Sequence, residues 1–189
     1  TPGYTDASGW LVWGRTIRDG MLPGALELVQ SDLTPERAIS FHKHATNASG
    51  IDPVRLIAKP AGDVDGDGVP DILIGVKALD NVAGADDRAN AVIVFGSALR
   101  SLASGRYDLN DPPANAQVNI AGLTTREAMS IALTSGDFDG DGQADVVLGS
   151  NEKRAAWTIF APAVIRARAS GRLDLSQPSI EDVLDRKST

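Results

Sequence analysis

The chain carries the same nine-residue acidic segment twice, and this duplication constrains its fold more than any other feature. Residues 63–71 and 137–145 both have Asp at positions 1, 3, 5 and 9 and Gly at positions 4 and 6. Each segment runs directly into a short apolar stretch, 72–74 in one copy and 146–148 in the other. Four carboxylates in nine residues repel one another unless a cation lies among them. The sequence therefore predicts two cation-binding turns, each leading into a strand.

The residue types of the two loops favour Ca²⁺. Carboxylate and carbonyl oxygens suit a hard cation with flexible coordination, whereas Mg²⁺ demands stricter octahedral geometry and Zn²⁺ prefers Cys and His. Gly68 and Gly142, at position 6, permit the positive φ of a sharp turn. Position 7 has no charged side chain and is expected to contribute its backbone carbonyl. The predicted ligands of two Ca²⁺ sites are Asp63, Asp65, Asp67, Val69 and Asp71, and Asp137, Asp139, Asp141, Gln143 and Asp145.

Neither loop is a complete EF-hand. That motif has a bidentate Glu at position 12, where this chain has Ile74 and Leu148. Position 9 must therefore close the site, and a strand rather than a helix is expected to follow. A solvated Asp/Gly turn without metal is the alternative interpretation, which the exact duplication disfavours.

Other segments recur in the same order around the acidic loops. Ala103-Ser104-Gly105-Arg106 matches Ala169-Ser170-Gly171-Arg172, and each follows an apolar stretch that ends in an aromatic residue. A repeat of this length with several short strands indicates a propeller or another all-β array. Four strands are predicted per unit, at 54–59, 72–76, 91–95 and 117–120, and again at 130–135, 146–149, 156–160 and 179–183. Short helices are predicted at 34–44, 97–104 and 162–170.

The acidic loops, the strands after them and Phe95-Gly96 resemble the FG-GAP repeats of the integrin alpha-subunit propeller and its bacterial relatives. The resemblance is good over about residues 50–165 and weak elsewhere, and the Gly-Ala-Pro part of the repeat is missing after Gly75 and Gly149. It implies an all-β, partial β-propeller of about two to three four-stranded blades, with Ca²⁺ in the hairpin between the first two strands of a blade. The blade repeats are expected at 1–32 (partial), 33–122 and 123–189.

A closed propeller normally needs at least four blades. We therefore expect further blades, from the rest of a longer chain or from another subunit. The resemblance implies a calcium-stabilised extracellular module, secreted or on the cell surface, that presents loops to a protein or glycan in adhesion or recognition. The alternative is an accessory or scaffold domain of a secreted hydrolase or lyase whose catalytic residues lie outside this chain.

Composition narrows the classes of function that this chain can have. The two loops supply eight of the 25 acidic residues, and without them the 18 basic residues slightly outnumber the acids, so the net charge of −7 is concentrated in the loops. No basic run with interleaved aromatics suggests nucleic-acid binding, no apolar run approaches the length of a membrane span, and the absence of Cys excludes disulfides and thiol catalysis. No catalytic motif is evident, so we expect no enzymatic activity from this chain itself. His42 and His44 are expected at the surface, and Trp10, Trp13 and Trp157 are expected to pack between blades.

Overall fold

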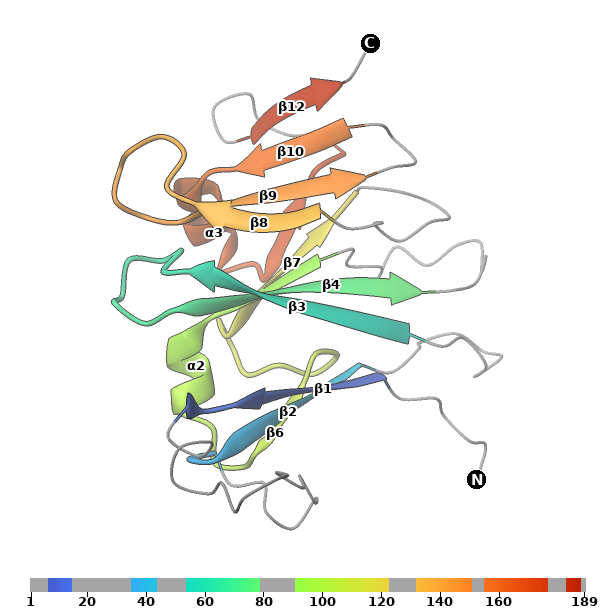
Figure 1. Ribbon diagram of the computed structural model, residues 1–189, viewed down its shortest axis with the longest axis vertical. Coiled ribbons are helices and arrows are strands. Elements are labelled where there is room, and N and C mark those ends of the chain that lie inside the picture. Colours follow the sequence, from blue (N-terminus) through green and yellow to red (C-terminus); the bar gives the residue numbers. More distant parts are fainter. Residues whose placement is uncertain are drawn as a thin grey trace.

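In a computed structural model the chain is mostly β, with three sheets, none of them closed (Figure 1). The structure describes residues 7–14, 35–43, 54–78, 91–122, 132–150, 155–176 and 183–187. The all-β expectation is therefore confirmed at the level of fold class. None of the described helices is long and apolar enough to cross a bilayer.

The three sheets follow one another along the long axis of the molecule (Figure 1). Sheet 1 has the order β1-β2-β6, with β1 at Ala7–Val12, β2 at Ala38–Lys43 and β6 at Arg106–Asp108. Sheet 2 has the order β11-β7-β5-β4-β3, with β3 at Val54–Gly62, β4 at Asp71–Ala78, β5 at Ala91–Val94, β7 at Gln117–Ala121 and β11 at Arg172–Asp174. Sheet 3 has the order β12-β10-β9-β8, with β8 at Ala132–Gly136, β9 at Asp145–Ser150, β10 at Ala155–Ile159 and β12 at Val183–Lys187.

Sheet 2 lies between two hydrophobic cores. Alternate residues of a strand point to opposite faces, so Leu73 and Ile93 pack toward sheet 3 while Ile74 and Val92 pack toward sheet 1. All four side chains are buried. This explains why β4 and β5 are apolar at nearly every position, since both faces of these strands are covered.

Two short helices follow the aromatic-ending strands. Helix α2 (Gly96–Arg100) begins after Phe95 at the end of β5, and α3 (Ala161–Ala167) begins after Phe160 at the end of β10. Both agree with the predicted helices, although each is shorter than expected. Figure 1 shows both on the side of the molecule from which the acidic loops project.

The recurring Ser-Gly-Arg segments connect neighbouring units. Strand β6 pairs in parallel with β2 of sheet 1, and β11 pairs in parallel with β7 of sheet 2, so each segment reaches back from the strands of one sheet to the sheet before it. The backbone bonds repeat closely: Ser40 N–H donates to the Gly105 carbonyl at 2.7 Å, and Asn119 N–H donates to the Gly171 carbonyl at 2.8 Å. The segments are therefore contacts between neighbouring sheets.

One expected helix is wrong. Residues 38–43, inside the helix predicted at 34–44, form strand β2, which pairs with β1 and whose residues Ala38 to His42 are buried. Ile39 and Phe41 of β2 pack with Tyr107 of β6 in one hydrophobic core. This tertiary burial overrides the helix-start signal of the local Thr-Pro-Glu sequence. Of the last predicted strand, at 179–183, only Val183 lies within the described residues, and it begins β12 (Val183–Lys187).

Candidate metal centre

The two acidic loops occupy equivalent places in the fold. One joins β3 to β4 in sheet 2, and the other joins β8 to β9 in sheet 3 (Figure 1). Both are hairpin connections between antiparallel strands. Each lies near the helix that follows the third strand of its unit, α2 after β5 and α3 after β10. Position-6 glycines Gly68 and Gly142 have φ of +81° and +89°, which confirms the left-handed turn expected there.

Three carboxylates converge in each loop. One oxygen each of Asp63, Asp65 and Asp71 lie within 4.8 Å of one another, and those of Asp137, Asp139 and Asp145 do the same. These are loop positions 1, 3 and 9. The structure thus brings together six of the ten residues predicted as ligands.

Position 9 forms the buried base of each loop. Asp71 is 1% exposed and accepts two backbone N–H bonds, from Val64 at 2.8 Å and from Gly96 at 2.9 Å. Asp145 is 0% exposed and accepts the equivalent bonds from Phe138 at 2.8 Å and Ala161 at 2.9 Å. One carboxylate therefore joins the loop, the second strand and the first residue of the helix.

Position 1 holds the turn of the loop. The Asp63 carboxylate accepts N–H bonds from Asp67 at 3.0 Å and Gly68 at 2.9 Å. The Asp137 carboxylate accepts the N–H groups of Gly140 at 2.7 Å and Gly142 at 3.0 Å. Backbone donors on these carboxylates fix the direction in which the remaining lone pairs point, which preorganises the cluster.

Positions 5 and 7 lie outside the two triads. Asp67 and Asp141 are exposed and accept the N–H groups of Val69 and Gln143, both at 2.8 Å. Asp141 also accepts a bond from the Gln143 side chain at 3.3 Å. The ligand roles of these four residues stay predictions.

Burial raises the pKa of two carboxyls in the first loop, Asp65 and Asp71, and the Arg168 charge offsets only part of this at Asp65. Burial raises the pKa of Asp71 to about 6, against the lowering effect of the Gly96 and Val64 amides. Burial is also the main cause of the raised pKa of Asp65, which the neighbouring Asp67 and Asp63 charges raise further. A bound cation relieves these costs, because it stabilises the ionised carboxylates.

The donor set suits a hard cation. Each triad offers only carboxylate oxygens, with no nitrogen or sulfur ligand among the described residues of either cluster. Oxygen-only sites with several carboxylates favour Ca²⁺, whereas imidazole and thiolate ligands favour Zn²⁺. The residues present therefore fit the calcium that the sequence suggests.

Sequence reasoning missed Arg168, which follows α3 in the second unit. Its guanidinium pairs with Asp65 of the first loop, lies 4.1 Å from the centroid of the Phe95 ring, and donates from Nε to the Asn115 carbonyl at 3.0 Å. Arg168 has no counterpart at the same offset in the first unit, so no repeat signal could have found it. Gly96 and Ala161 were also missed as donors, although each follows an aromatic residue at the same place in its unit.

The expectation of a surface position for His42 is wrong, and His44 lies outside the described residues. His42 is 9% exposed in β2, and its Nε2 lies 2.8 Å from Ser40 Oγ. Ser40 is fully buried and donates its hydroxyl hydrogen to the Gly105 carbonyl at 3.2 Å. His42 Nε2 and the Gly105 carbonyl oxygen therefore both lie within hydrogen-bond distance of Ser40 Oγ. The pair supports the contact between β2 and β6.

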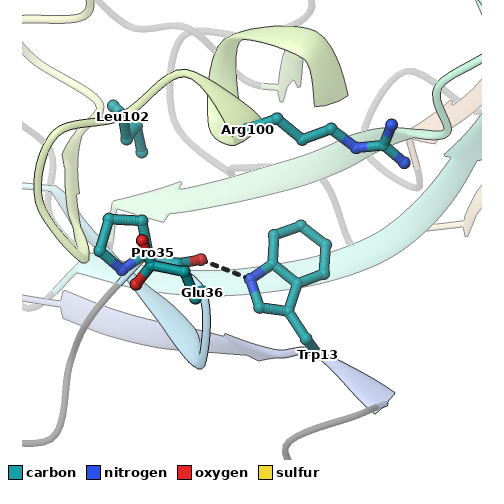
Figure 2. A pocket seen from close by; sticks show the side chains of 5 residues that line it. All are labelled: Trp13, Pro35, Glu36, Arg100 and Leu102. Carbon is teal, nitrogen blue, oxygen red and sulfur yellow. Dashed lines mark hydrogen bonds between the residues drawn. The ribbon is translucent and has the colours of Figure 1, made fainter.

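A hollow of about 500 Å³ opens beside sheet 1, lined by Trp13, Pro35, Glu36, Arg100 and Leu102 (Figure 2). The Trp13 indole N–H donates to the Pro35 carbonyl at 2.6 Å, so the backbone already satisfies it. Glu36 and Arg100 are exposed. Since none of these five side chains is a buried polar group aimed into the hollow, the acidic loops remain the candidate site.

The tryptophans differ in their surroundings. Trp157 is buried in the core between sheets 2 and 3, and Trp13 packs against the core between sheets 1 and 2, as expected for packing between units. Trp10 is 42% exposed.

In comparisons with known proteins, no family model, no curated protein and no solved structure matches this chain.

Proposed function

We propose that this chain is a calcium-stabilised segment of a β-propeller that acts outside the cell, where it presents loops to a protein or glycan partner. Two Ca²⁺ ions would be held by the loops 63–71 and 137–145. Their role is structural: the ligands converge only in the folded chain, so metal-binding free energy becomes folding stability. Loops of this kind fill at the millimolar calcium of extracellular fluids and stay largely empty in cytosol.

The observation that carries the proposal is the duplicated carboxylate triad. The two loops differ in sequence at positions 2, 7 and 8, yet both bring positions 1, 3 and 9 together at the tip of equivalent hairpins. Backbone N–H donors hold each triad in this arrangement, and a shared cation would offset the repulsion between its like charges.

The blade interpretation is supported by the equivalence of sheets 2 and 3. Strands β3, β4, β5 and β7 are adjacent in that order in sheet 2, and β8, β9, β10 and β12 are adjacent in that order in sheet 3. Sheet 3 packs on one face of sheet 2 through a shared core. Repetition of this packing around an axis is what builds a propeller.

Further blades would cover the outer face of sheet 3. At loop position 2, Val64 is 0% exposed where sheet 3 packs on sheet 2, whereas the equivalent Phe138 is 54% exposed. Phe138 occupies the position at which sheet 3 buries Val64 of sheet 2, so an equivalent unit packed on sheet 3 would cover it. We therefore propose that another repeat unit packs on this face.

Calcium-dependent stability tests the proposal. Protein stripped with EDTA should melt at a markedly lower temperature than protein in 2 mM CaCl₂, since ligand at about 100 times its dissociation constant adds about 2.7 kcal/mol per site. Circular dichroism at 218 nm and scanning calorimetry measure the shift. Mg²⁺ at the same concentration should give a smaller shift.

The matched variants remove one ligand in each loop. Asp63→Asn and Asp137→Asn should each reduce the calcium-dependent shift, and the double variant should abolish it. Asp174→Asn is the control, because Asp174 is exposed and pairs with Arg172 away from either triad. Equal melting curves in EDTA and in calcium would falsify the proposal.

A further inference from the structure

The two acidic loops have different electrostatic surroundings, although their aspartates are identical. In the first loop the Asp65 side chain is only 3% exposed, and the Arg168 guanidinium pairs with its Oδ2. Within the part of the chain that the structure describes, no basic side chain pairs with Asp139, the equivalent residue of the second loop. Among the described residues, the first loop is therefore paired with a positive charge and the second is not.

Arg168 is held in place by more than this ion pair. Its guanidinium stacks 4.1 Å from the centroid of the buried Phe95 ring, and its Nε donates to the Asn115 carbonyl at 3.0 Å. Its side chain is 31% exposed. A planar guanidinium fixed by stacking and by a backbone bond cannot leave the loop at low cost.

We propose that Arg168 competes with calcium for the first loop, so that the second loop binds Ca²⁺ more tightly and the two sites fill in sequence. This inference rests on the proposed calcium-binding function. A divalent ion among the first-loop aspartates must share Asp65 with a guanidinium that bonds one of its two oxygens, and the two positive charges repel at close range. The second loop pays no such cost.

The competition also couples calcium to the packing of units. Arg168 belongs to the second unit, whereas Asp65, Phe95 and Asn115 belong to the first. Without calcium, Arg168 joins the two units by neutralising the first loop. With calcium in that loop, the ion pair weakens and the stacking on Phe95 remains.

Calorimetric titration of chelator-stripped protein with CaCl₂ tests the inference. Wild-type protein should show two steps with dissociation constants that differ about tenfold, because a half-buried charge near the surface acts through partial screening. Asp137→Asn should remove the tighter step, and Asp63→Asn should remove the weaker one; neither carboxylate pairs with Arg168. These two variants assign the steps to loops without altering the arginine.

Substitution of the arginine tests the cause. Arg168→Gln should tighten the weaker step about tenfold, so that the two steps merge, whereas Arg168→Lys should keep them apart. Arg172→Gln is the matched control, since it removes the same charge from the same unit but from an exposed pair with Asp174. It should leave both constants unchanged.

Each outcome separates this inference from the function on which it rests. If wild-type protein takes up no calcium at millimolar concentration, the proposed function fails and the inference fails with it. Two uptake steps of equal affinity, or loss of the tighter step in Asp63→Asn, overturn the inference alone. Weaker binding in Arg168→Gln than in wild type also overturns it, because Arg168 would then support the ligand rather than compete with the ion. If Arg168→Gln does not fold, the step assignment from Asp63→Asn and Asp137→Asn still decides the matter.

Discussion

A single methyl group at Gly96 should destabilise the first unit although alanine occupies the equivalent position of the second. A Cβ at Gly96 would lie 2.1 Å from the Pro70 carbonyl oxygen and 2.7 Å from Val69 Cγ1. The first contact is with backbone, so the loop or the helix must shift. The Gly96 N–H donates to the buried Asp71 carboxylate, so the same shift weakens that bond.

The magnitude follows from opposing contributions. Overpacking of a buried site costs about 1–3 kcal/mol, and weakening a bond to a charged acceptor costs up to about 1.5–3 kcal/mol. The better helix propensity of Ala returns about 1 kcal/mol. We therefore expect Gly96→Ala to lower the free energy of unfolding by about 2–4 kcal/mol.

Urea denaturation in excess EDTA measures this effect without a contribution from metal. Ala161→Gly is the matched control, because Ala161 N–H donates to Asp145 in the same way and its methyl group is buried. It should lower stability by only about 1 kcal/mol, through helix propensity and the lost methyl contact. If Gly96→Ala raised stability, as an ordinary Gly→Ala change in a helix does, the close approach of loop and helix inferred here would be wrong.

Three further predictions concern burial and protonation. Val64→Ser should cost about 2–3 kcal/mol in urea denaturation, whereas Phe138→Ser, at the equivalent exposed position, should cost less than about 0.5 kcal/mol. Trp157→Ala should cost about 3–5 kcal/mol, and Trp10→Ala less than about 1 kcal/mol; comparable losses would contradict the assignment of Trp157 to the core. Because the pKa of Asp71 is raised to about 6 without metal, calcium binding should release a proton and weaken as pH falls through about 6. Calorimetry in two buffers of different ionisation enthalpy detects that proton. The same raised pKa means that this group's contribution to metal-free stability falls as pH rises from about 4 to about 6, so acid urea titrations should show the opposite pH trend from calcium affinity.

The local parts of the fold could be predicted from sequence. The acidic loops, the apolar strands after them and the helices after Phe95 and Phe160 each depend on residues close together in the chain. Turn glycines and short apolar runs specify such elements directly.

The remaining parts depend on contacts between distant residues. Strand β2 was expected to be helical because Pro35 and Glu36 look like a helix start, and only burial against β1 and β6 makes residues 38–43 a strand. Strands β6 and β11 have three residues each, too few for any periodicity, and they exist because a preceding unit offers an edge.

The site was predicted as a set of ligands, and the structure adds a second role for one of them. Asp71 and Asp145 were expected only to close the metal site. Each also accepts the first N–H of the following helix, 25 residues away from Asp71 and 16 residues away from Asp145. Because the two separations differ, a motif with fixed spacing could not have predicted these hydrogen bonds.

In the strand contacts between sheets, a later segment of the chain reaches back to an earlier sheet. Strand β6 reaches back to β2, and β11 reaches back to β7. At the loops, Ala144 N–H donates to the Asp63 carbonyl at 3.0 Å and Ser135 Oγ donates to the Pro60 carbonyl at 3.1 Å, so here the second unit donates to the first. Arg168 adds a charged contact in the same sense.

This direction has a consequence for stability. In repeat proteins, stability is approximately the sum of the units and their nearest-neighbour interfaces. Here the interface between sheets 2 and 3 includes a strand, a loop contact and a core, and all of them depend on the later unit being folded against the earlier one. Calcium in the second loop, Asp137–Asp145, would therefore stabilise both units, because Ala144 of that loop contacts the first loop at Asp63. Calcium in the first loop instead meets Arg168 and acts partly against the interface. The same metal, bound to two loops with identical aspartates, is thus expected to stabilise the array unequally, since the neighbours of each loop differ.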